Sequence, residues 1–85
     1  MANVTAQPTP NPAAYKFTIE GHRFDGPISI GSAAEAGGTP FEPLFSLSGV
    51  KAIFATADFV TITKDSAADW TGIVDSATET LSIAF

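Results

Sequence analysis

The amino-acid sequence predicts an α+β domain in which helices pack on one face of a four-stranded antiparallel sheet. Residues 14–19, 50–56 and 59–64 combine alternation with β-branched and aromatic side chains, which is typical of strands. Residues 67–83 repeat apolar side chains at helical spacing. Three serine or threonine residues, each followed three residues later by a carboxylate, mark three helix starts. The predicted order of elements is β-β-α-β-β-α.

The N-terminal third is predicted to hold two strands. Residues 1–8 are small, polar and unpatterned, so we expect a disordered tail, and the domain then spans residues 9–85. Two prolines make residues 9–12 a stiff lead-in. Residues 14–19 form the first strand, and residues 28–31 form a short second strand. We expect these two strands to pair as a hairpin across a long loop.

Two short helices are expected next. Ser32 and Glu35 have the spacing of a capping box, and two glycines end that turn. Thr39 and Glu42 form a second box, with proline at the first helical position. The second helix is predicted over residues 40–47.

The C-terminal half is predicted to be a hairpin followed by a longer helix. Strands over residues 50–56 and 59–64 are joined by a two-residue turn. Ser66 is the expected cap and Asp69 completes a third capping box, so the helix is predicted over residues 67–83. Its apolar stripe consists of Trp70, Ile73, Val74, Ala77, Leu81 and Ala84.

The composition excludes several classes of function. The chain has 85 residues, no cysteine, one histidine and a formal net charge of −5. Without cysteine there is no disulfide, no thiolate nucleophile and no cysteine-ligated zinc or iron–sulfur cluster. The acidic balance argues against nucleic acid or anionic lipid as a partner. No segment is long and apolar enough to span a membrane, and residues 1–14 lack signal-peptide features. We therefore expect a cytoplasmic monomer that binds neither nucleic acid nor membrane.

No recognisable motif brings together the side chains that catalysis needs. The single imidazole, His22, lies in a glycine-flanked loop and is interpreted as solvated. Helix starts at Ser32 and Thr39 offer N–H groups to an anion, but no lysine completes a phosphate-binding loop. Asp58 and Asp65 are weak evidence for a cation site. Capping and solubility explain the carboxylates Asp65, Asp69, Asp75 and Glu79. The sequence predicts no enzyme, no cofactor and no metal site.

Two features leave alternatives open. Lys16 and Lys64 lie on predicted strands, where they either share a face as a small basic spot or are ordinary solvated lysines that protect edges. Phe59 is predicted to face away from Val60 and Ile62. It either packs under the N-terminal segment, which we favour, or belongs to a surface that binds a partner.

The assembled motifs resemble the N-terminal domain of the Nfu/NifU-type iron–sulfur scaffold family. The match covers residues 9–85. Its most specific parts are Thr9-Pro10-Asn11-Pro12 with Lys16-Phe17, then Gly49-Val50 with Ile53-Phe54, then Asp58-Phe59-Val60-Thr61-Ile62-Thr63-Lys64, and Trp70. Further matches are Ser32 with Glu35-Ala36, and Thr39-Pro40 with Leu44-Phe45.

The resemblance implies an α+β domain with a role near iron–sulfur cluster assembly or delivery. In full-length members a second, C-terminal domain carries the C-x-x-C pair that ligates the cluster, and this chain has no cysteine. The resemblance therefore implies a non-catalytic interaction module that does not ligate the cluster and whose partner is an iron–sulfur scaffold or client protein. The alternative is a domain that binds small anionic ligands or phosphopeptides. Candidate residues of the interaction surface are Asn11, Lys16, Lys51, Phe59 and Lys64.

Overall fold

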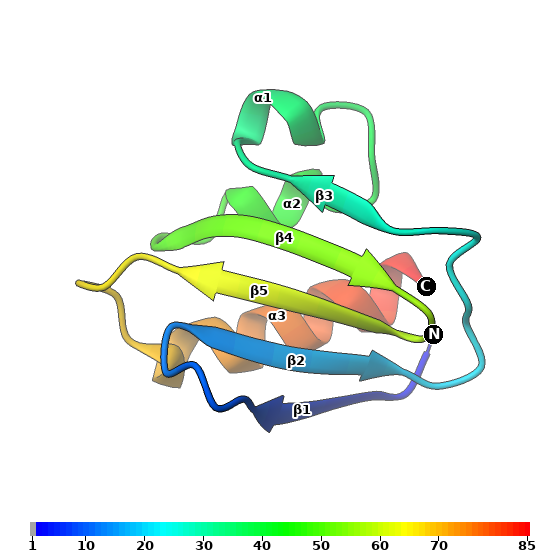
Figure 1. The fold of residues 1–85 in the computed structure, drawn as a ribbon, viewed down its shortest axis with the longest axis horizontal. Helices are drawn as coiled ribbons and strands as arrows, with labels where there is room; N and C mark the ends of the chain where they lie inside the picture. Colours follow the sequence, from blue (N-terminus) through cyan, green and yellow to red (C-terminus); the bar gives the residue numbers. More distant parts are fainter. Residues whose placement is uncertain (1) are drawn as a thin grey trace.

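The computed structural model describes residues 2–85, which form one sheet backed by helices (Figure 1). The strands are β1 (Val4–Pro8), β2 (Ala14–Ile19), β3 (Ile28–Ile30), β4 (Val50–Thr56) and β5 (Phe59–Lys64). The helices are α1 (Ala33–Ala36), α2 (Glu42–Phe45) and α3 (Trp70–Ala84). The helix ribbons of α2 and α3 lie behind the sheet in Figure 1, so one broad face of the sheet carries no helix.

The predicted α+β class is confirmed, but the sheet has five strands rather than four. Its order is β1-β2-β5-β4-β3, and every neighbouring pair is antiparallel. The additional strand is β1, which lies in the segment that the sequence led us to expect as a disordered tail. It pairs with β2 from Val4 opposite Ile19 to Pro8 opposite Tyr15. Only Val4 and Ala6 of β1 are apolar residues that face the core, so the alternation of the segment is too weak to predict a strand from the sequence alone.

The predicted hairpin between residues 14–19 and 28–31 is wrong. β3 pairs with β4, and β2 is flanked instead by β1 and β5. The loop between β2 and β3 crosses the end of the sheet, where Phe24 N–H donates to the Ala57 carbonyl at 2.7 Å. That crossing delivers β3 to the opposite edge of the sheet.

The core lies between the sheet and the helices. The sheet contributes the buried side chains of Phe17, Ile53 and Ile62 to this core. Helix α3 contributes Ile73, Ala77 and Leu81. Each fully buried large side chain stabilises the fold by about 1.5–3 kcal/mol. The predicted stripe of α3 is thus confirmed in its central part, whereas Ala84 at its end is exposed.

Helix α3 begins later than predicted. Its N-cap is Asp69, whose carboxylate accepts hydrogen bonds from the Thr71 backbone N–H at 3.1 Å and the Thr71 hydroxyl at 3.0 Å. The predicted cap, Ser66, precedes the helix. Asp65 delays the start of the helix by holding residues 65–68 in a turn. Its carboxylate accepts a hydrogen bond from Ala67 N–H, and its carbonyl accepts one from Ala68 N–H.

Helix α2 is a single turn, shorter than the predicted residues 40–47. The Thr39 hydroxyl donates to the Ala36 carbonyl at 2.7 Å and accepts from Phe41 N–H at 3.2 Å, so it serves the connection between α1 and α2. The N-cap position is Phe41, without a side-chain bond. Within residues 2–85 no helix has the length and apolar character needed to cross a membrane.

Candidate functional site

One broad face of the sheet is free of helices. Because Phe17, Ile53, Val60 and Ile62 point into the core, their neighbours along each strand point to the other side. One row of this open face crosses all five strands, through the register partners Gln7, Lys16, Thr61, Phe54 and Ser29. We call the outward residues of the strands the open face: Thr5, Gln7, Lys16, Thr18, Ser29, Ala52, Phe54, Thr56, Phe59, Thr61 and Thr63.

Lys16 and Phe59, two of the predicted surface residues, meet on the open face. The Lys16 ammonium nitrogen lies 4.7 Å from the centroid of the Phe59 ring, within the range of a cation–π contact. The cross-strand partners of Phe59 are Thr18 and Thr56, so it is two strands away from β1. Phe59 therefore packs against Lys16 rather than under the N-terminal segment. Phe54 stands nearby on β4 with 42% of its surface exposed.

Charge is divided between the sheet and the rest of the molecule. In the described residues, none of the nine acidic side chains lies in a strand, whereas three of the four basic side chains do. The acids lie in turns, loops and helices. One of them, Asp69, caps α3, and the hydrogen bonds from Thr71 lower the pKa of its carboxyl. The strands that form the open face therefore carry no acidic side chain, in a chain whose net charge is −5.

The other predicted basic residues do not join Lys16. Lys64 pairs with Val50 and has the same parity as Ile62, so it points to the helix side, with its ammonium 5.9 Å from the Trp70 ring centroid. The alternative in which Lys16 and Lys64 share a face is therefore not realised. Lys51 is exposed at an irregularity in the β4–β5 register.

Asn11, the remaining predicted surface residue, has a structural task in the turn between β1 and β2. Its side-chain oxygen accepts from Ala13 N–H at 3.0 Å, and its own N–H donates to the Thr9 hydroxyl at 3.2 Å. Trp70 Nε1–H donates to the Pro12 carbonyl at 3.0 Å, which ties α3 to this turn. The Thr9-Pro10-Asn11-Pro12 motif thus has a structural role as a turn.

The helix starts that could attract an anion already hold the chain's own carboxylates. Gly31 N–H donates to Glu35 Oε2 at 2.7 Å, and Gly38 N–H donates to Glu42 Oε2 at 3.1 Å. Both helices are single turns, so neither has an appreciable dipole. A second anion would meet negative charge at both places.

His22 is more buried than the sequence suggested. It is half-buried, and its ring centroid lies 4.7 Å from that of Phe24 and 4.6 Å from that of Phe85. Phe41 completes this aromatic cluster, 5.8 Å from Phe85. The imidazole therefore packs as part of the core rim. Within residues 2–85, no three histidine, aspartate or glutamate side chains come together as metal ligands.

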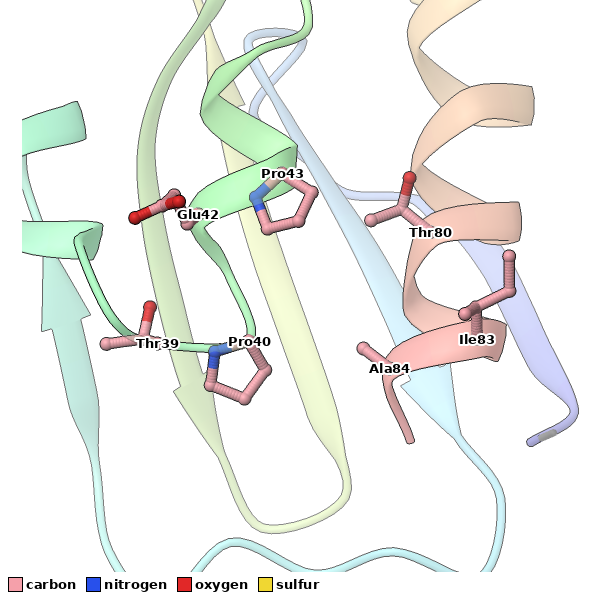
Figure 2. A pocket seen from close by; sticks show the side chains of 7 residues that line it. All are labelled: Thr39, Pro40, Glu42, Pro43, Thr80, Ile83 and Ala84. Carbon is pink, nitrogen blue, oxygen red and sulfur yellow. The ribbon is translucent and has the colours of Figure 1, made fainter.

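Sequence reasoning missed a groove between α2 and the end of α3. Figure 2 shows Pro40 and Pro43 on one side and Thr80, Ile83 and Ala84 on the other. Its volume is about 570 Å³, and Ile83 is 66% exposed beside it. The sequence held one signal for this groove, because Ile83 is an apolar residue on the otherwise polar side of the predicted C-terminal helix. The groove offers apolar contact and no nucleophile–base pair.

Comparisons with known proteins identify a family and several relatives that the chain resembles. The family described as "Scaffold protein Nfu/NifU N terminal" matches residues 4–85. The NFU1 iron-sulfur cluster scaffold homolog of Drosophila ananassae is 38% identical over 74 residues, which are 79% of this chain and 24% of that protein. Conserved virulence factor C of Staphylococcus haemolyticus is 30% identical over 83 residues, 96% of this chain and 22% of that protein. The chain thus spans about a quarter of the length of these relatives.

Solved structures share the fold of this chain. The crystal structure of SAV1430 from Staphylococcus aureus superposes with a TM-score of 0.80 at 20% identity, covering 93% of this chain and 98% of that one, which shows the shared fold. The solution structure of SeR13 from Staphylococcus epidermidis has a TM-score of 0.67 at 27% identity and covers both chains completely. The fold, the sequence match over residues 4–85 and the identity to named relatives lead to one conclusion: the chain belongs to the Nfu/NifU scaffold N-terminal family.

Proposed function

We propose that this domain is a non-catalytic protein-interaction module that assists iron–sulfur cluster assembly or delivery without ligating the cluster, and that it binds its protein partner through the open face. The observation that carries the proposal is the open face itself. It presents the exposed ring of Phe54 and the Lys16–Phe59 pair on a sheet that contains no acidic residue, in a chain with net charge −5.

The chemistry of the open face favours a flat partner surface with acidic residues around an apolar centre. Aromatic rings supply buried area at low cost in side-chain entropy, and threonine hydroxyls offer hydrogen bonds to a partner. Lys16 is held near Phe59, so its charge is already positioned for an acidic group.

The iron–sulfur context comes from the family. The Drosophila relatives are named as iron–sulfur cluster scaffold homologs, and the match to this chain covers about a quarter of their length. With no cysteine in its sequence, this chain lacks the usual cluster ligand. The proposal therefore assigns cluster ligation to the partner. It also includes a cytoplasmic location, although the Drosophila relatives are named as mitochondrial.

An NMR titration tests this proposal. A cognate iron–sulfur scaffold protein is added to the ¹⁵N-labelled domain, and we expect chemical-shift changes concentrated on β2, β4 and β5. Phe54→Ser should weaken binding by about tenfold or more, because an exposed aromatic anchor is lost. Ile83→Ser is the matched control, since it removes a comparably exposed apolar side chain beside the groove instead.

The outcomes separate four cases. Weakening by Phe54→Ser alone supports the open face, whereas weakening by Ile83→Ser alone assigns binding to the groove and overturns the proposed surface. No response to any scaffold or client protein would contradict the interaction module. Shifts at Gly31 or Gly38 on addition of phosphoamino acid would support the anionic-ligand alternative, which requires displacement of Glu35 or Glu42.

A further inference from the structure

Strand β1 is the outer strand at one edge of the sheet, and its hydrogen-bonding pattern can be assigned. Glu20 N–H donates to the Asn3 carbonyl at 2.9 Å, while Ile19 N–H turns the other way, to the Asp58 carbonyl at 2.7 Å. Because antiparallel pairs alternate, Thr5 and Gln7 bond to β2. The backbone groups of Val4, Ala6 and Pro8 therefore point away from the sheet, and within residues 2–85 no strand pairs with them.

This edge lacks the features that usually prevent strand pairing. The β1 sequence VTAQP contains no charge, its register with β2 is uninterrupted, and its only proline is the last residue. The opposite edge is different, since β3 has only three residues and leads directly toward α1. β1 is also held in place, because Ala2 N–H donates to the Ser82 carbonyl and the Ser82 hydroxyl donates to the Ala2 carbonyl.

We propose that two copies of the chain pair through β1, antiparallel, with Ala6 opposite the second copy's Ala6. In this register each Ala6 N–H donates to the second copy's Ala6 carbonyl, and each Val4 N–H donates to the second copy's Pro8 carbonyl. Pro8 has no N–H, so it leaves no donor unpaired at the end of the seam. The two sheets become one continuous sheet of ten strands around a twofold axis.

The side chains along β1 favour a second copy as the occupant. On the open face, Thr5 comes opposite the second copy's Gln7, and the two polar uncharged side chains meet without repulsion. On the core side, the small Val4 and Ala6 allow close approach. A partner segment with charged residues would gain no matching charge from this strand. The pairing replaces the monomer expected from size and charge, and it is independent of the proposed function.

The expected dimer is weak and has a characteristic salt dependence. A five-residue seam is far smaller than a standard protein interface. Each copy carries a net charge of −5, so the copies repel each other. Added salt screens this repulsion, and we expect it to strengthen the association. An association driven by opposite charges would instead weaken.

A crosslinking experiment tests the register. The chain has no cysteine, so Thr5→Cys and Gln7→Cys each introduce the only thiol. When the two variants are mixed under mild oxidation, the mixed disulfide dimer should form at least about tenfold faster than either self-dimer, because residues 5 and 7 are opposite each other only across the seam. Equal initial rates for mixed and self-crosslinking would overturn the proposed register, and no crosslinking would overturn the pairing.

Sedimentation over a range of concentrations tests the edge itself. Ala6→Pro removes an N–H that points away from the sheet and breaks no bond to β2, so its dimer dissociation constant should rise by about tenfold or more. If that variant loses its folded ¹⁵N spectrum, the double variant Thr5→Glu and Gln7→Glu places like charges across the seam, adds to the repulsion between the copies and keeps the backbone intact. An unchanged dissociation constant in a folded variant, or a monomer at every concentration, contradicts the proposal.

Discussion

Gly49, which directly precedes β4, has a backbone conformation and a close neighbour that both disfavour a side chain. Its φ is +95°, in the region that L-residues rarely adopt. A Cβ added there would lie less than 3.0 Å from Ala68 Cβ and 3.4 Å from Ile73 Cδ1. The Gly49 carbonyl also accepts from Asp65 N–H at 2.7 Å, so the two segments have little freedom to separate.

The cost of Gly49→Ala can be assembled from these two terms. The positive φ costs about 1–2 kcal/mol, and the overlap with Ala68 costs about 1–3 kcal/mol. Replacing glycine also restricts the unfolded chain, which offsets about 0.4–1 kcal/mol. The net loss is therefore roughly 1–4.6 kcal/mol, and the melting temperature should fall by about 4–8 °C for each kcal/mol lost in a domain of this size.

Gly21→Ala is the matched control. Gly21 has nearly the same φ, +82°, but nothing lies within 4 Å of its added Cβ, so only the conformational cost remains. We expect a loss of about 0–1.6 kcal/mol, and urea unfolding measures the loss for both variants. Adding Ala68→Gly to Gly49→Ala should recover about 1–3 kcal/mol by removing the overlap. If Gly49→Ala is no worse than Gly21→Ala, the packing explanation is refuted.

Three further predictions concern α3. Because the pKa of Asp69 is lowered in the fold, its capping bonds to Thr71 stabilise the protein fully above the unfolded pKa of about 3.9, and this stabilisation is lost as pH falls through the folded pKa. The difference in unfolding free energy between wild type and Asp69→Ala should therefore vanish in acid. Asp69→Asn keeps the cap and should remove this pH dependence. Trp70→Phe should cost about 1 kcal/mol in urea unfolding through the lost bond to Pro12, and an unchanged midpoint would contradict a role for that bond. Gly72→Ala, with no atom within 4 Å of the added Cβ, should raise stability by about 0.5–1 kcal/mol, and a destabilised variant would show that the helix face is more crowded than the structure indicates.

Local patterns predicted the elements whose signal lies in their own residues. The bounds of β2, β4 and β5 agree with the structure because their alternation or β-branched content is strong. The apolar stripe of α3 identified its buried residues for the same reason. The start of α3 was misplaced, since Ser66 and Asp69 both fit a cap and only the turn at Asp65 excludes the first.

The candidate surface could be predicted only in part. Alternation alone placed Phe59 on the face opposite Val60 and Ile62, and the structure agrees. Whether Lys16 joins Phe59 or Lys64 depends on how β2 is aligned against β5, and a shift of one residue would exchange the faces. The groove beside α2 needed the packing of two helices that are far apart in the sequence.

The sequence by itself determined the fold class, most strand bounds, the absence of cysteine ligands and the family resemblance, because each of these depends on residue identity and short-range spacing. The tertiary structure alone decided that residues 4–8 form an edge strand, that β3 pairs with β4, and that Lys16 lies over Phe59. These three outcomes depend on which strands become neighbours and in which register. Long-range pairing sets both, and the free energy of that pairing is shared among residues too distant in sequence to form a local pattern.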